Sequence, residues 1–142
     1  MTNESVIVPN LDPDMIDKVF TFNELIIGAG DIDINPLDDA KFNWTMKAYS
    51  EEMVEFAKGY KEQDAVQMVD ATFDLIYFAL GTLKKMGLSR EQAIACFNHI
   101  HEKNMLKKKG KLETRGNHED DAVKPAEWVG PEEGISQILF LE

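Results

Sequence analysis

Apolar residues recur at helical spacing through most of the chain, and this pattern predicts four helices. Capping residues and helix-compatible proline mark where helices begin, and glycine marks where several of them end. The expected helices run from Met15 to Ile27, from near Asp38 to Gly59, from near Gln63 to Lys85, and from Ser89 to about Met105. These segments predict an all-α fold, a helical bundle of about four helices.

The chain after Leu106 has a different pattern. A basic run from Lys107 to Lys111 is followed by polar residues, proline and glycine, so we expect an irregular C-terminal tail of loops or short extended structure. The apolar end from Ile135 to Leu141 is expected to dock on the body or on a neighbouring subunit, or to form a short strand. The predicted organisation is a single domain over 1–142, with a helical body over about 12–106 and a loop-rich tail over 107–142.

Composition narrows the class of protein. The chain has 142 residues, 44% of them hydrophobic, which is the size of one compact domain. Its net charge of −11 argues against nucleic acid and against an anionic membrane surface as partners. We expect no signal sequence and no segment long enough to span a bilayer. The single cysteine, Cys96, cannot form an internal disulfide, and we expect a buried thiol in a cytoplasmic protein.

Two aspartates, Asp70 and Asp74, lie one helical turn apart in a stretch that is otherwise apolar. Like charges at this spacing repel, and a carboxylate that leaves water without a partner costs roughly several kcal/mol. The preceding helix adds Glu51, Glu52 and Glu55, so each helix presents its carboxylates on one face. Antiparallel packing would bring the two acidic faces together, and we expect divalent cations to bind between them.

The donor types favour a hard cation. Mg²⁺ and Mn²⁺ prefer carboxylate oxygen, whereas zinc sites favour histidine and thiolate ligands, which this cluster lacks. For the three glutamates alone, a solvated helix face is the commoner explanation. That explanation is weaker for Asp70 and Asp74, because solvated faces rarely interrupt a hydrophobic stretch in this way. The sequence therefore predicts a magnesium or manganese site.

Several segments resemble the all-α nucleoside triphosphate pyrophosphohydrolases, which include MazG-like enzymes, dimeric dUTPases and phosphoribosyl-ATP pyrophosphohydrolases. The segment Glu51 to Glu55 resembles the E-E-x-x-E helix of this family. Asp70 to Thr82 is similar to the D-A-x-x-D-x-x-Y-x-x-x-G-T helix of its phosphoribosyl-ATP-pyrophosphohydrolase-like branch, which often occurs in phage. His101 to Met105 and Asp121 to Trp128 resemble the downstream H-x-x-N-M and D-A-x-K-P-x-x-W elements. One position departs from the branch, because Gln67 stands where a glutamate is usual.

The resemblance implies hydrolysis between the α and β phosphates of a nucleoside triphosphate, which releases a monophosphate and pyrophosphate. Because an amide binds a cation less strongly than a carboxylate, the implied ligands leave Gln67 out. They are Glu52, Glu55, Asp70 and Asp74. Glu51 or Glu52 is the candidate base that accepts a proton from water. A homodimer or homotetramer is implied, and it would complete the bundle.

An acidic metal site needs cations opposite it to hold the β and γ phosphates. The candidates lie in the fourth helix and in the tail. They are Asn104, His101, Lys107, Lys108, Lys111, Arg115 and Lys124. A solvated helix end explains about half of the lysines equally well. Asn104, His101 and Lys124 are favoured because they match the family elements.

The base of the substrate is less well defined by the sequence. Trp44, Phe22 and Asn23 are candidates for contacts with a base, but an aromatic residue at helical spacing more often packs in a core, and we favour that explanation. Members of the family that the chain resembles act on pyrimidine or purine nucleotides, and some phage enzymes of this kind remove purine deoxynucleotides such as dGTP from the pool. A purine deoxynucleotide is therefore the favoured substrate.

The main alternative is a non-catalytic acidic helical protein that binds a partner, for example by mimicking the charge of DNA. The net charge supports it. A charge mimic would display its acids outward, however, rather than place two of them in an apolar helix. Ferritin-like di-iron chemistry is disfavoured because the chain has none of the Glu-x-x-His pairs that it needs.

Overall fold

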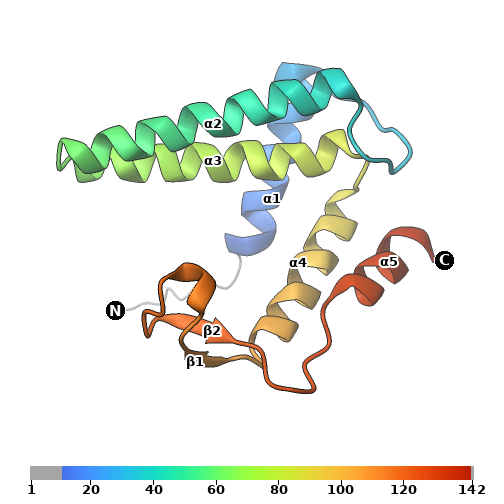
Figure 1. Cartoon of the computed structure of the whole chain (residues 1–142). Coiled ribbons are helices and arrows are strands. Elements are labelled where there is room, and N and C mark those ends of the chain that lie inside the picture. Colours follow the sequence, from blue (N-terminus) through green and yellow to red (C-terminus); the bar gives the residue numbers. More distant parts are fainter. Residues whose placement is uncertain (1–10, 142) are drawn as a thin grey trace, which may run out of the picture. The chain divides into compact units, whose positions relative to one another are not determined.

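The computed structural model describes residues 11–141 (Figure 1). The all-α prediction is confirmed, since 66% of the residues are helical and the only sheet in the described part has two short strands. The chain divides into two compact units, which we call the first unit, ending at Arg90, and the second unit, beginning at Glu91.

The first unit is built on a long antiparallel pair of helices, the α2–α3 hairpin (Figure 1). A short linker of residues 62–64 joins its two helices. The elements of this unit are α1 (Leu11–Phe22), the π-helical turn η2 (Asn23–Ile27), α2 (Asp39–Lys61) and α3 (Ala65–Lys85). These bounds agree with the predicted helices except at the start of α1, which begins four residues before Met15. Proline in the first turn is compatible with that earlier start, because its missing N–H has no partner there in any helix.

Capping side chains fix the starts of the two hairpin helices. The carboxylate of Asp38 accepts a hydrogen bond from the backbone N–H of Lys41 at 2.8 Å, and Asp64 accepts one from Gln67 at 3.1 Å. Such caps satisfy backbone donors that have no partner inside a helix. Gly87, with a φ of +102°, follows the end of α3. Because these capping residues can be recognised in the sequence, the bounds of α2 and α3 were predicted to within a few residues.

The core of the first unit is small. It is formed mainly by Ile16, Val19 and Phe20 of α1, with Ala48 and Ala71 from the hairpin. By contrast, large apolar side chains along α3 remain open to solvent in the single chain. Val66, Val69 and Phe73 are 79%, 55% and 57% exposed. The hairpin therefore carries an apolar face that no other part of the described chain covers.

The helix α3 corrects one expectation from the sequence. It has 21 residues and is apolar enough, by length and composition, to cross a membrane. We expected no such segment. A single helix of this kind is weak evidence for a membrane span, because soluble helices pass the same test, and α3 carries both aspartates of the acidic cluster. A soluble protein is consistent with this helix.

The second unit combines two helices with a small antiparallel sheet (Figure 1). In the sheet Lys108 pairs with Val123 and Gly110 with Asp121, which confirms the predicted short extended structure. The elements are α4 (Arg90–Asn104), β1 (Lys108–Gly110), the 3-10 turn η3 (Glu113–Arg115), β2 (Asp121–Val123) and α5 (Glu132–Phe140). Cys96 is buried, as predicted, and its burial raises the pKa of the thiol.

The helix α5 is the element that the sequence analysis missed. A short strand was one expectation for Ile135 to Leu141, and that expectation is wrong. The spacing of Ile135, Ile138 and Leu139 fits one helical face, and two glutamates in the first turn suit a helix N-terminus. The imidazole of His99 on α4 occupies the space where a side chain on Gly134 would lie, so α5 packs closely on α4 at that glycine.

Candidate functional site

The α2–α3 hairpin brings the five predicted carboxylates into one electrostatic cluster. We call it the acidic cluster; its members are Glu51, Glu52 and Glu55 on α2, and Asp70 and Asp74 on α3. Burial is the first cause that raises the pKa of Glu52, followed by the charges of the other four carboxylates. Residues from two helices therefore act on one carboxyl group, as the antiparallel arrangement predicted.

Glu52 is the buried member of the cluster. Its residue is 7% exposed, and its Oε1 atom is buried without a hydrogen-bond partner in the described residues. A buried carboxylate oxygen without a partner is costly, and such an exception calls for an explanation such as a ligand or an ion. Glu52 also lines an apolar pocket of about 240 Å³ between α2 and α3. Glu52 is thus the strongest single candidate for a functional group.

This placement reverses part of the sequence argument. A solvated face was favoured for the glutamates alone, which holds for the exposed Glu51 and Glu55 but is wrong for Glu52. Burial was expected for the aspartates, yet Asp70 is exposed and Asp74 is half-buried. The reason is that the apolar neighbours of Asp70 on α3 are themselves open to solvent in the single chain. An apolar sequence neighbourhood does not by itself give burial.

The carboxylates of the acidic cluster do not converge on one point in the described structure. Among residues 11–141, no three His, Cys, Asp or Glu side chains converge closely enough to hold a metal ion. Mutual repulsion between carboxylates disfavours such convergence. The donor chemistry nevertheless suits a hard divalent cation, because every group is a carboxylate and one buried oxygen has no partner. Gln67, half-buried one turn before Asp70, adds an amide near this set.

The predicted phosphate contacts all lie in the second unit, and two of them share one aromatic ring. The ammonium groups of Lys107 and Lys124 lie 5.0 and 4.9 Å from the ring centre of Trp128. The indole N–H of Trp128 donates a hydrogen bond to the carbonyl of Lys103 at 2.7 Å, which fixes the ring. These two lysines are therefore held in place by cation–π contacts rather than free at a helix end.

The other predicted contacts are less defined. Arg115 is engaged by Asp121, whose carboxylate accepts a hydrogen bond from Nη1 at 2.7 Å. Lys108 lies on β1 with an exposed side chain. Lys111, His101 and Asn104 are also exposed. The role of each as a phosphate contact stays a prediction.

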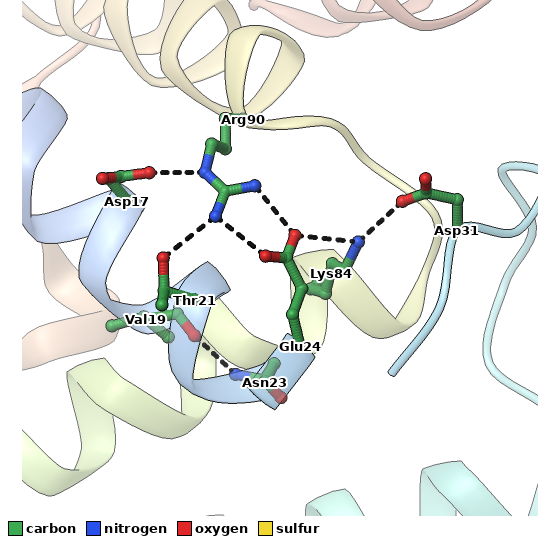
Figure 2. A network of polar contacts seen from close by, with 8 residues as sticks. All are labelled: Asp17, Val19, Thr21, Asn23, Glu24, Asp31, Lys84 and Arg90. Carbon is green, nitrogen blue, oxygen red and sulfur yellow. Dashed lines mark hydrogen bonds and ion pairs between the residues drawn. The ribbon is translucent and has the colours of Figure 1, made fainter. Parts of the chain in front are cut away.

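The first unit also contains a network of ion pairs that the sequence did not predict (Figure 2). The guanidinium of Arg90 donates two hydrogen bonds to Glu24, at 2.8 and 3.0 Å, and others to Asp17 and Thr21. Lys84 is 4% exposed, and its ammonium lies 3.5 Å from Glu24. It also donates a hydrogen bond of 2.9 Å to Asp31. The network connects α1 and η2 to the end of α3. Its partners are far apart in the sequence, so no local sequence pattern predicts them.

Glu24 joins the two cations of this network, so its neutralisation should destabilise the first unit. The hydrogen bonds from Arg90 hold the pKa of Glu24 below its ordinary value. A lowered pKa in the folded state means that the stabilisation is present at neutral pH and is lost as the pH falls through that pKa. We expect Glu24→Gln to lower the melting temperature at neutral pH and to have little effect in acid. Glu62→Gln, at the exposed end of α2, is the control, and equal effects of the two variants at both pH values would contradict the prediction.

Together the hairpin and its acidic cluster define an all-α protein whose candidate site lies on two antiparallel helices. A model of the phosphoribosyl-ATP pyrophosphohydrolase family matches residues 22–104, which include the whole hairpin. The chain belongs to this family. No curated protein matches the chain significantly. The family makes the protein a hydrolase of the pyrophosphohydrolase type, whose substrate resembles a nucleotide triphosphate.

Proposed function

We propose that the protein hydrolyses a nucleoside triphosphate between its α and β phosphates. The single observation that supports this most strongly is the buried, unpartnered Oε1 of Glu52 within a cluster of five carboxylates. Such a concentration of negative charge repels a triphosphate unless cations lie between them. The five carboxylates lie within residues 22–104, the range that the family model matches, and this supports the proposal.

We propose Mg²⁺ or Mn²⁺ as the cofactor. The residues that would hold it are Glu52, Glu55, Asp70 and Asp74. A bound divalent cation would neutralise phosphate charge and lower the pKa of an attacking water. The carboxylates would in turn lose the mutual repulsion that disfavours their convergence in the free protein. Gln67 is too weak a donor to be counted among the ligands.

The chain itself would supply the proton acceptor. Water oxygen bonds to the α phosphorus, the bond from this phosphorus to the α–β bridging oxygen breaks, and pyrophosphate leaves with that oxygen. The proton of the water passes to a carboxylate, for which Glu51 and Glu52 are the candidates. In the metal-free protein, burial and the neighbouring carboxylates raise the pKa of Glu52. Glu51 is exposed, so water reaches it without a rearrangement of the helix.

Cations of the second unit would bind the phosphates that leave. Lys107 and Lys124 are the best candidates, because Trp128 already holds both ammonium groups near one position. Asn104 and His101 would assist from the end of α4. Charge-assisted hydrogen bonds to phosphate are roughly twice as strong as neutral ones. The remaining proposed contacts are Lys108, Lys111 and Arg115.

The proposed setting is a cytoplasmic homodimer or homotetramer that acts on the deoxynucleotide pool. The exposed apolar face of α3 supports association, since burial of such side chains stabilises an assembly. A purine deoxynucleotide such as dGTP is the proposed substrate.

Phosphorus NMR of a reaction with dGTP and Mg²⁺ tests the proposal. We expect pyrophosphate and dGMP as the first products, and in water labelled with ¹⁸O we expect the label in dGMP. This pattern follows because water attacks the α phosphorus. Orthophosphate and dGDP as first products would contradict the proposed reaction, as would a label found only in pyrophosphate.

A further inference from the structure

The first unit contains a second pocket, of about 470 Å³, at the end of the hairpin farther from the linker. Its walls come from residues 27–32, the first turns of α2 and the last turn of α3. Ile27, Ile32 and Trp44 give it an apolar lining, and Trp44 is 47% exposed. Packing in the core was the favoured explanation for Trp44. It is wrong, because Trp44 is half exposed, whereas Asn23 is buried. A volume of this size is ordinary for a small-molecule site.

Two lysines give the pocket a positive wall. The ammonium of Lys85 lies 3.4 Å from the ring centre of Trp44, and Lys41 lines the same pocket. Burial, and then the charge of Lys41, lower the pKa of Lys85. No ion pair joins either ammonium to a carboxylate in the part of the chain described. Lys84, which also lines the pocket, is already paired with Glu24 and Asp31.

The walls of the pocket are held in place without a ligand. The backbone N–H of Asn35 donates to the carbonyl of Met86 at 3.0 Å, and the ion pair of Lys84 with Asp31 ties the same loop to α3 (Figure 2). Gly28 and Gly30 leave open space where side chains would otherwise lie. No side chain therefore narrows the pocket at these two positions.

The two lysines of the pocket lie on the same helix faces as members of the acidic cluster. Lys41 precedes Glu52 by eleven residues on α2, and Lys85 follows Asp74 by eleven residues on α3. Eleven residues are close to three helical turns, so each lysine shares a face with its carboxylate, about 16 Å along the axis. Trp44 lies nearer to the cluster, about 12 Å from Glu52. One extended nucleotide can bridge such a span, with its phosphates at the cluster and its base at Trp44.

We infer that this pocket binds the base of the substrate and selects a purine with an oxygen at position 6, that is guanine or hypoxanthine. The inference rests on the proposed function. The isoleucines and Trp44 suit a flat apolar ring, and the volume holds a two-ring base. An ammonium only donates hydrogen bonds, so Lys85 pairs with the oxygen of guanine but not with the amino group of adenine. A site built to donate to an oxygen rejects the analogue that presents a donor instead.

The test compares kcat/KM for dGTP, dITP and dATP in wild type and in Lys85→Met. We expect wild type to prefer dGTP and dITP over dATP by about tenfold or more, the usual scale for one charged hydrogen bond. Lys85→Met should lose this preference, mainly because kcat/KM falls for dGTP and dITP. Lys85→Arg should keep the preference. Lys47→Met, an exposed lysine of α2 outside the pocket, is the control and should behave like wild type.

Binding of dGMP and dAMP by calorimetry gives a readout that needs no turnover. We expect wild type to bind dGMP more tightly than dAMP, and Lys85→Met to bind both alike. If no triphosphate is hydrolysed but this difference persists, the proposed reaction fails and the base pocket stands. If hydrolysis occurs while Lys85→Met keeps the wild-type order of substrates, the base assignment is overturned. Circular dichroism confirms that each variant folds.

Discussion

Glu52→Gln is expected to reduce pyrophosphate release by about 100-fold or more, because a positioned proton acceptor or metal ligand contributes on this scale. Glu52 is the buried member of the acidic cluster, and the other four carboxylates are exposed or half-buried, so none of them can take over its position. Asp74→Asn and Glu55→Gln should also abolish hydrolysis. Steady-state rates at saturating Mg²⁺ measure the effect, and Glu62→Gln, away from the cluster, should keep the wild-type rate.

The same substitutions should preserve or raise thermal stability in the presence of a chelator. Each replaces a charged group in a repulsive cluster by a neutral group of the same shape, so the folded state loses an unfavourable interaction. In wild type, adding Mg²⁺ should raise the melting temperature, and in Glu52→Gln this gain should be smaller. Full activity of all three variants would place the site elsewhere. Loss of activity together with lower stability in chelator would indicate a structural role.

Replacing two apolar residues of α3, Val69 and Phe73, by aspartate should break the proposed oligomer. Val69 and Phe73 are more than half exposed in the single chain. In an oligomer each would bury the remaining half of its apolar surface, worth about 1 kcal/mol. Val69→Asp combined with Phe73→Asp should therefore shift the protein to monomer, as measured by light scattering, and should lower activity as the assembly is lost.

Val129→Asp is the matched control for this experiment. Val129 is 65% exposed and lies in the second unit, outside the hairpin. It should leave the mass of the assembly unchanged. A wild-type protein that is monomeric at all concentrations would contradict the prediction, and so would a doubly substituted protein that keeps its full mass.

The helices were predictable because their signals are local. Asp38 and Asp64 predict the starts of α2 and α3, and both cap those helices in the structure. The helix α5 was harder to predict from the sequence, because it is short and lies close to proline and glycine residues that favour loops. Its stability includes packing at Gly134 against His99, and no local pattern reveals that contact.

The members of the acidic cluster were predictable, but their burial was not. Helical spacing placed each set on one face, and hairpin formation joined the faces. Which carboxylate is buried depends on tertiary packing, and the buried one is Glu52 rather than Asp70. The pairs that Arg90 makes with Asp17 and Glu24 depend on tertiary packing alone. Trp44 likewise carried the sequence pattern of a core residue, although the structure opens it to a pocket.

The short linker between α2 and α3 has a kinetic consequence. Contacts across the hairpin next to this linker join residues that are close in sequence, and such local contacts form faster than distant ones. The hairpin needs nothing beyond Lys85 for its own pairing, so during synthesis it can form while residues 91–142 are still being added. The part of the chain that carries the carboxylates is therefore expected to acquire structure early, ahead of the C-terminal third.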